Sequence, residues 1–266
     1  MEISVAAAGK KLRSVRGKVA VMPIVGVVEQ RSSLFQYYFG GASTEAIGAA
    51  LDEMMGRSDV AAIVLDVDSP GGSIDGVQEL SDKIFQARKT KPIYAISNSS
   101  MYSAAYWIAS SATSTFATTG GGVGSVGVYI MHWEESEGLA DRGIKVNMIR
   151  KPEHKAEANA VERLTAAGRE HLQSVVDSSY VAFTAAVARN RGVDAATVRN
   201  DYGGGRIVLA KDAKAAGMID GIKTMDSLLL ELAGGEPARS SARANVDILR
   251  KRAEHRARVD LKRQNG

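Results

Sequence analysis

The stretch from Pro92 to Ser110, PIYAISNSSMYSAAYWIAS, joins a short apolar run to an apolar helix-like segment. The run Pro92–Ile96 is typical of a buried strand, and the residues after Tyr102 favour a buried helix. Ser103 stands at the junction and is followed by two alanines. A hydroxyl at a helix N-terminus lies near free backbone N–H groups that favour negative charge. Ser103 is therefore either a helix N-cap, the usual role of serine there, or a nucleophile.

Strand-like and helix-like segments alternate on both sides of this stretch. Lys18–Val28 and Val60–Val67 are rich in β-branched apolar residues, and Ile74–Arg88 has amphipathic spacing. This alternation predicts an α/β fold with a mainly parallel sheet, in which sites lie beyond the carboxyl ends of strands. The other predicted elements are helices at 43–55, 134–142, 165–191, 208–216 and 225–233, and strands at 115–117, 126–130 and 145–149.

Composition limits the classes of protein to which the chain can belong. Its 266 residues are 45% hydrophobic and 24% charged, which suits a globular protein with a sizeable core. The absence of cysteine excludes disulfides, cysteine nucleophiles and thiolate metal sites. No window approaches the roughly 18 apolar residues of a membrane span, and no signal-peptide pattern precedes the first charges. We therefore expect a cytoplasmic protein with neither a membrane anchor nor a metal or other cofactor.

Charge and composition divide the chain into three segments. Residues 1–17 are expected to form an N-terminal leader, residues 18–234 a single globular domain, and residues 235–266 a basic helical tail. From Arg239 onward the tail holds nine Lys/Arg and three Asp/Glu. Apolar residues at helical spacing predict a narrow-faced helix that docks on a partner, or a solvated tail. A nucleic-acid-binding role rests on this charge alone and is disfavoured.

A turn and the serine segment supply two parts of a possible acyl-transfer site. Such a site needs a nucleophile, a base and an oxyanion hole. Gly71 and Gly72 follow a predicted strand and a proline, so their backbone can approach a ligand closely. With the N–H of Ala104 they could hold a developing oxyanion next to Ser103. Alone, a Pro-Gly-Gly sequence is equally compatible with a plain strand-to-helix turn.

The base is harder to assign from the residues. His132 and His154 lie in predicted loops without an assignable acidic partner, so a Ser-His-Asp triad is unsupported. A lysine acts as a base only when burial keeps it neutral. Lys151 and Lys155 follow a predicted strand and are candidates, although either residue alone is typical of a solvated surface.

Five motifs in this order resemble the signal peptide peptidase A family of Ser/Lys-dyad proteases, and above all its phage branch, which includes capsid assembly proteases. The resemblance spans roughly Lys18–Leu232 and implies a Clp protease/crotonase-like fold, a parallel sheet with flanking helices. The motifs are DSPGG at 68–72, SAAYWIAS at 103–110, GSVGV at 124–128, IRKPEHKAEAN at 149–159 and GRIVLAKDAKAAGMID at 205–220.

The resemblance implies a role for each matching residue. Ser103 would be the nucleophile and Lys155 the general base, with the Ser125 hydroxyl orienting the lysine amine. The peptide N–H of Gly71 or Gly72, together with that of Ala104, would form the oxyanion hole.

Around the lysine the chain departs from the family pattern. Family members often have glycines where this chain has Pro152, Glu153 and His154. Glu153 and Glu157 flank Lys155, and carboxylates pointing at its amine would oppose base function.

The resemblance also implies a homo-oligomer. Family members assemble into rings or domes in which a neighbouring subunit can contribute the lysine, so an isolated protomer would keep Ser103 and Lys155 apart. The implied function is a phage prohead protease that cleaves scaffold, portal or itself. Three alternatives stay open: a relative that degrades cellular signal peptides, a crotonase-like acyl-CoA enzyme, and a non-catalytic capsid assembly or scaffold protein.

Overall fold

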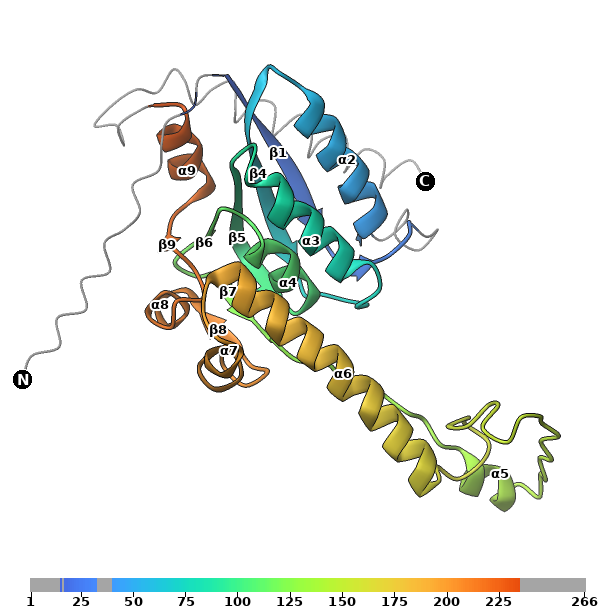
Figure 1. Ribbon diagram of the computed structural model, residues 1–266. Coiled ribbons are helices and arrows are strands. Elements are labelled where there is room, and N and C mark those ends of the chain that lie inside the picture. Colours follow the sequence, from blue (N-terminus) through green and yellow to red (C-terminus); the bar gives the residue numbers. More distant parts are fainter. Residues whose placement is uncertain (1–14, 16, 33–39, 235–266) are drawn as a thin grey trace, which may run out of the picture.

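The computed structural model describes residues 15, 17–32 and 40–234. A parallel sheet forms its centre, as the alternating pattern predicts (Figure 1). The strand order is β1-β4-β5-β6-β9, and every neighbouring pair in this order is parallel. These strands are Lys18–Val25 (β1), Val60–Ser69 (β4), Ile93–Tyr102 (β5), Ser114–Ala117 (β6) and Gly221–Ile222 (β9).

Four shorter strands complete the sheet structure. The strand β7 (Gly122–Gly124) pairs in parallel with the last residues of β5, and β8 (Ile207–Leu209) is antiparallel to β7. The strands β2 (Val28–Glu29) and β3 (Ala42–Ser43) form a separate two-stranded sheet. The extra pairing of β7 matters for function because it lies at the carboxyl end of β5, next to Ser103.

Helices cover both faces of the sheet (Figure 1). On one face, α2 packs on α3, α3 on α4, and α4 on α6. On the other face, α9 buries its leucines against β4 and β5 in a smaller apolar cluster. The helices are Thr44–Gly56 (α2), Val77–Ala87 (α3), Ala104–Ser110 (α4), Ser136–Asp141 (α5), Ala166–Arg191 (α6), Ala195–Asp201 (α7), Ala210–Ala215 (α8) and Met225–Leu232 (α9).

The helix α4 is the most deeply enclosed element of this layer, since all seven of its residues are buried. The Trp107 ring stacks on Phe183 of α6 with centroids 4.5 Å apart. The buried Asn190 amide at the end of α6 donates to the Ser110 hydroxyl (2.9 Å). Burial of such large side chains contributes about 1.5–3 kcal/mol each, so α4 and the C-terminal half of α6 form one packed unit.

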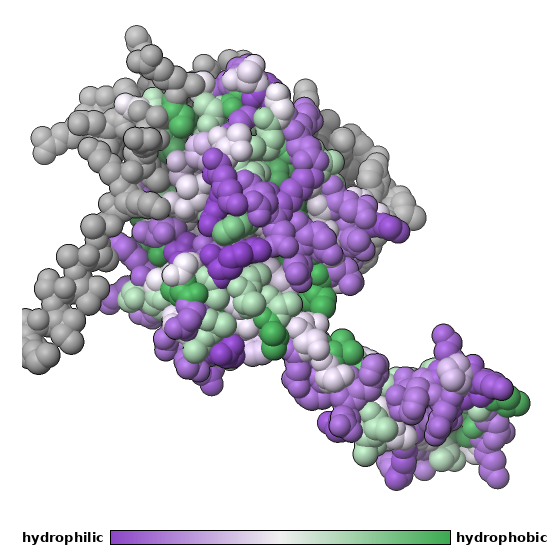
Figure 2. Space-filling view, viewed as in Figure 1, coloured by the Kyte–Doolittle hydropathy of each residue, from purple (hydrophilic) through white to green (hydrophobic). Residues whose placement is uncertain are grey.

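Residues 128–165 form a projection, here called the arm, beside the N-terminal half of α6, and the rest of the described chain is here called the body (Figures 1 and 2). Polar contacts tie it to itself: Glu134 accepts from the Leu164 N–H (3.0 Å), and Arg150 pairs with Glu162 (2.5 Å). The hydrogen bond from Arg150 lowers the pKa of the Glu162 carboxyl. Large apolar side chains of the arm are nevertheless exposed, among them Tyr129, Met131, Trp133 and Ile149.

Several sequence predictions need correction. Residues 126–130 and 145–149 have no regular secondary structure and pair with no strand among the described residues, so they are not strands. The predicted helix at 208–216 begins only at Ala210, because Val208 pairs with Val123 in the β7–β8 ladder. The helix α7 was not predicted, and β5 continues to Tyr102 rather than ending at Ile96.

Other predictions hold or fall outside the structure. Ser43 caps α2, and the long helix α6 matches its predicted range to within a residue. Most of the leader, residues 33–39 and the basic tail lie outside the described residues. Within the described ranges, no helix is both long and apolar enough to cross a membrane.

Candidate active site

Ser103 follows β5 directly and occupies the N-cap position of α4 in a strained conformation. Its backbone has φ 52° and ψ −124°, a region that non-glycine residues rarely adopt. The Ser103 N–H donates to the Gly124 carbonyl (2.7 Å), and its carbonyl accepts from the Trp107 N–H (3.0 Å). The side chain makes no capping hydrogen bond. The N-cap interpretation is therefore wrong for the hydroxyl, which is half-exposed at a sharp strand-to-helix turn.

Gly71 lies directly against Ser103. It has φ 94°, and a Cβ built on it would lie 2.6 Å from the Ser103 Cβ and 2.8 Å from the Tyr102 carbonyl oxygen. No other residue fits this position, for reasons of both conformation and space. The buried Gly71 N–H donates to the Oγ of Ser69 (3.1 Å), which is itself fully buried. This N–H is therefore already used within the turn.

Gly72 offers its N–H in a different direction. It forms a parallel bridge with Val28: the Val28 N–H donates to Gly71, and the Ser73 N–H donates to Val28 (both 2.9 Å). Because N–H groups alternate in direction along an extended chain, the Gly72 N–H points away from Val28. Ala104 is the first residue of α4, where helix N–H groups lack an intrahelical partner. The N–H groups of Gly72 and Ala104 are thus the pair that this turn leaves available beside Ser103.

Ser125 lies next to Ser103 because of strand pairing. The register of β5 and β7 places Tyr102 opposite Gly124, so each serine is the residue that follows a paired position. Ser125 also has a positive φ, 53°, and its N–H donates to the Arg206 carbonyl (2.9 Å). Both serines are half-exposed at the same edge of the sheet.

Lys155 lies on the arm and not beside Ser103. Its side chain is exposed and its N–H donates to the Pro152 carbonyl (3.0 Å). Within the described part of the chain it forms no ion pair, and the Glu157 carboxylate lies 3.3 Å from His154 instead. Figure 1 shows the arm extending beyond the N-terminal end of α6, away from α4. One protomer therefore brings together Ser103, Gly71, Gly72, Ala104 and Ser125, but not Lys155.

The two histidines considered as bases also lie on the arm. The Nε2 atom of His132 is 3.2 Å from the Asn159 carbonyl oxygen, and His154 contacts Glu157. Neither belongs to the group of residues around Ser103, so a Ser-His-Asp triad within one protomer remains unsupported.

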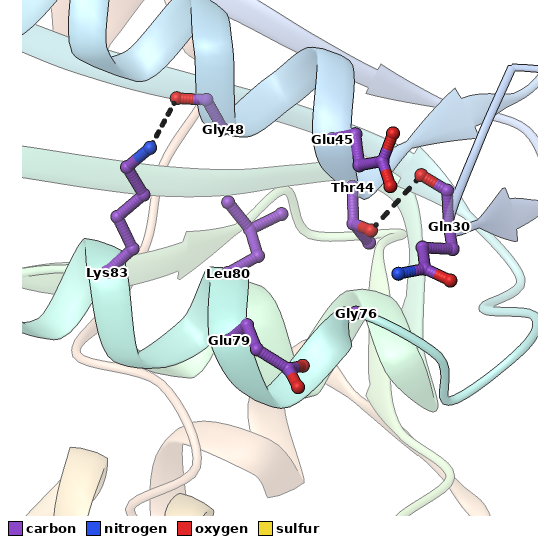
Figure 3. Close-up of a pocket in the computed structure, with 8 residues that line it drawn as sticks. All are labelled: Gln30, Thr44, Glu45, Gly48, Gly76, Glu79, Leu80 and Lys83. Atoms are coloured by element: carbon purple, nitrogen blue, oxygen red, sulfur yellow. Dashed lines mark hydrogen bonds between the residues drawn. The ribbon is translucent and has the colours of Figure 1, made fainter.

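One cavity adjoins the residues around Ser103 and Ser125, and a second cavity is separate from them. A cavity of about 290 Å³ begins at Val126, one residue after Ser125, and is lined also by Val128, Tyr180 and Gly205 at the root of the arm. A second cavity, of about 240 Å³, lies between α2 and α3, and Figure 3 shows the Lys83 amine directed at the Gly48 carbonyl (3.0 Å) within it. The second cavity contains none of the candidate site residues. It is lined by Gln30, Thr44, Glu45, Gly48, Gly76, Glu79, Leu80 and Lys83.

Sequence reasoning missed two residues of this region, Asp68 and Ser69. Both belong to the DSPGG motif, but only its glycines were given a role. The Ser69 hydroxyl oxygen accepts a hydrogen bond from the Gly71 N–H, and the Asp68 carboxylate accepts hydrogen bonds from the hydroxyls of Ser99 and Ser100. The only sequence signal was their position directly before the glycines.

Comparisons with known proteins agree on the type of protein. The sequence model of peptidase family S49 matches residues 86–237. The head-tail preconnector protein GP5 of Enterobacteria phage P21 is 33% identical over 181 residues, which are 67% of this chain and 36% of that protein. The capsid assembly protease C of Escherichia phage lambda is 31% identical over 180 residues, 68% of this chain and 41% of that protein. The chain therefore spans well under half the length of these phage relatives.

A solved structure supports the fold. A mutant of the 1510-N membrane-bound stomatin-specific protease superposes with a TM-score of 0.50 at 15% identity, covering 83% of this chain and 86% of that one. At this identity the likeness concerns the fold alone, and it agrees with the parallel sheet and flanking helices described above. Because the family match covers more than half of its residues, the chain belongs to peptidase family S49.

Proposed function

We propose that the chain is a serine endopeptidase with Ser103 as its nucleophile. The observation that carries this proposal is the strained Ser103 turn packed against Gly71, with the N–H groups of Gly72 and Ala104 at hand. Backbone strain of this kind, about 1–3 kcal/mol, persists only where surrounding structure enforces it, and it clusters at active sites. Membership of a peptidase family supports the same chemistry.

In the proposed reaction the Ser103 Oγ attacks the scissile carbonyl carbon as Lys155 accepts its proton. The carbonyl oxygen becomes an oxyanion, which accepts hydrogen bonds from the N–H groups of Gly72 and Ala104. Collapse of this intermediate expels the amine product, which takes the proton back from Lys155. Water then hydrolyses the Ser103 ester through the reverse proton transfers, which frees the acid product and restores Ser103.

We propose that the Lys155 amine comes from a neighbouring copy of the chain. The arm that carries it projects from the body, and Trp133 and Ile149 on it are 72% and 99% exposed. Exposed apolar side chains gathered on one projection favour a contact with another protein surface. In the assembled form, Ser125 would accept or donate a hydrogen bond that orients the incoming amine.

The proposed substrates are phage scaffold or portal proteins, or the chain itself, processed at the procapsid in the host cytoplasm. The two phage relatives, by their names a head-tail preconnector protein and a capsid assembly protease, support this role. The cavity that begins at Val126 would take a substrate side chain close to the scissile bond.

The test is labelling and cleavage by the full-length chain. We expect a fluorophosphonate probe to label the wild-type protein once, at Ser103, and Ser103→Ala to abolish both labelling and the processing of co-expressed scaffold and portal proteins. The matched control is Ser97→Ala, six residues earlier on β5, which should keep the labelled serine. Full processing by Ser103→Ala would contradict the proposal. Binding of acyl-CoA without labelling would favour a crotonase-like enzyme, and neither activity would favour an assembly protein.

A further inference from the structure

The strand that ends at Ser103 has an irregularity where it leaves one neighbour and joins another. Against β4, the pairing steps from Val67 opposite Ser97 to Ser69 opposite Met101. Residues 98–100 of β5 therefore lie opposite a single residue of β4, Asp68. On its other side, β5 pairs with β6 up to Ser97 and with β7 from Ser100 onward. This segment, 98–100, is here called the bulge.

The bulge determines which residue of the segment after β4 lies opposite Ser103. An unbroken register from Val67 and Ser97 would place Ser103 opposite Ser73. The observed register places it opposite Gly71, two residues or about 6.6 Å earlier along the chain. Only this second arrangement gives the close contact between Ser103 and Gly71. Bulges next to active sites re-aim side chains in this way.

One carboxylate holds the bulge. The Oδ1 atom of Asp68 accepts hydrogen bonds from the hydroxyls of Ser99 and Ser100, the latter at 2.7 Å. The backbone carbonyl of Asp68 accepts from the Gly26 N–H (2.9 Å), which fixes the carboxylate's own strand against the β1–β2 connection. Hydrogen bonds to an ionised oxygen are about twice as strong as neutral ones. Ser100 lies three residues before Ser103, and Asp68 lies three residues before Gly71. The hydrogen bond between Ser100 and Asp68 therefore connects the two chain segments just before the contact of Ser103 with Gly71.

We propose that Asp68 is a positioning residue for the nucleophile: its carboxylate holds the bulge that brings Ser103 opposite Gly71. This inference rests on the proposed role of Ser103. Asp68 acts through Ser99 and Ser100 and does not touch the reacting atoms.

The experiment measures the rate constant for fluorophosphonate labelling of Ser103 in the full-length chain, well below the melting temperature of every variant. We expect Asp68→Ala to label about 100-fold more slowly, because a misplacement of about 1 Å has such an effect. Asp68→Asn should recover most of the rate, since its amide oxygen still accepts. The double variant Ser99→Ala/Ser100→Ala should label as slowly as Asp68→Ala, with no further loss when all three changes are combined.

The matched control is Asp59→Asn, one residue before the other end of the same strand, where an exposed carboxylate contacts Lys18 and Arg57. It should label at the wild-type rate whatever its melting temperature. Wild-type labelling of Asp68→Ala, or a loss that matches only its unfolded fraction, would overturn the positioning role. Persistent labelling of Ser103→Ala would instead show that the proposed nucleophile is wrong, so the two failures are distinguishable.

Discussion

The body and the arm of this protein differ in how far their side chains are buried. In the body, every residue of α4 is buried, and Ser103 is held between β7 and the first turn of that helix. In the arm, no residue of α5 is buried, and apolar side chains such as Trp133 and Ile149 face outward. The body therefore has a complete core, whereas the arm keeps apolar surface that another chain could cover.

This difference agrees with the proposed distribution of the catalytic residues. A strained backbone such as that of Ser103 needs rigid surroundings, which the packed body supplies. In the proposal, Lys155 has only to reach the right place, and a projecting arm could bring it to a neighbouring copy of the chain. The proposed enzyme would be pre-organised at its oxyanion site and yet inactive until it assembles.

The largest expected effect comes from replacing the two proposed catalytic residues, Ser103 in the body and Lys155 on the arm. Ser103→Ala should abolish cleavage, and Lys155→Ala should lower it by about 10²–10⁴-fold, the usual contribution of a positioned base. If the lysine acts in the neighbouring subunit, mixing the two inactive variants restores active sites that combine an intact serine with an intact lysine. In a random assembly about one quarter of the sites would be intact. The measurement is cleavage of a co-expressed substrate protein after co-assembly.

The matched control is Lys151→Ala, four residues away on the same exposed segment, which should retain activity. If the mixture stays inactive although both variants co-assemble, Ser103 and Lys155 must act within one protomer. The arm would then have to fold back on its own body, and the contrast between the two regions would disappear.

A stability measurement tests the same contrast with a smaller effect. Phe183→Ala should lower the free energy of unfolding by about 3–5 kcal/mol, because Phe183 is buried and stacks on Trp107 of α4. Ile149→Ala on the arm should change it by less than about 0.5 kcal/mol, while shifting the monomer–oligomer equilibrium toward monomers. Denaturant titrations and light scattering measure the two quantities. Equal losses of stability for both variants would show that the arm is part of the core.

The same contrast explains how far the sequence could predict the structure. Val60–Ser69 begins with a nearly continuous apolar run, and Ala166–Arg191 is a proline-free segment that ends at Gly192, so their predicted ranges are close to the observed ones. Predictions failed where pairing depends on distant residues. The apolar run at 126–130 resembles a strand but has no partner strand among the described residues, and Val208 joins a ladder with β7 that no local pattern indicates.

Motifs located the candidate residues but not their separate roles. The DSPGG motif indicated an oxyanion turn, yet which glycine N–H is free depends on the Ser69 hydroxyl, and hence on a side-chain orientation. The position of Ser103 opposite Gly71 depends on the bulge in β5, which is a feature of register rather than of composition. In the proposed enzyme, Lys155 reaches Ser103 only on assembly, so the sequence of one chain could suggest this pairing only by resemblance.

The smallest of these effects concerns Ser69 and tests which glycine N–H beside Ser103 is free. Ser69→Ala removes the acceptor of the Gly71 N–H and leaves that buried donor unsatisfied, which should cost about 1–3 kcal/mol of stability. The freed N–H could then turn toward the oxyanion and compete with that of Gly72, so fluorophosphonate labelling should slow as well. Ser97→Ala is the matched control: it also deletes a buried hydroxyl with a backbone partner, the Gly122 carbonyl at 3.2 Å, but lies outside the turn. It should lower stability without changing the labelling rate. If Ser69→Ala resembled the wild type in both measurements, Ser69 would not hold Gly71, and the assignment of Gly72 as the free donor would lose its basis.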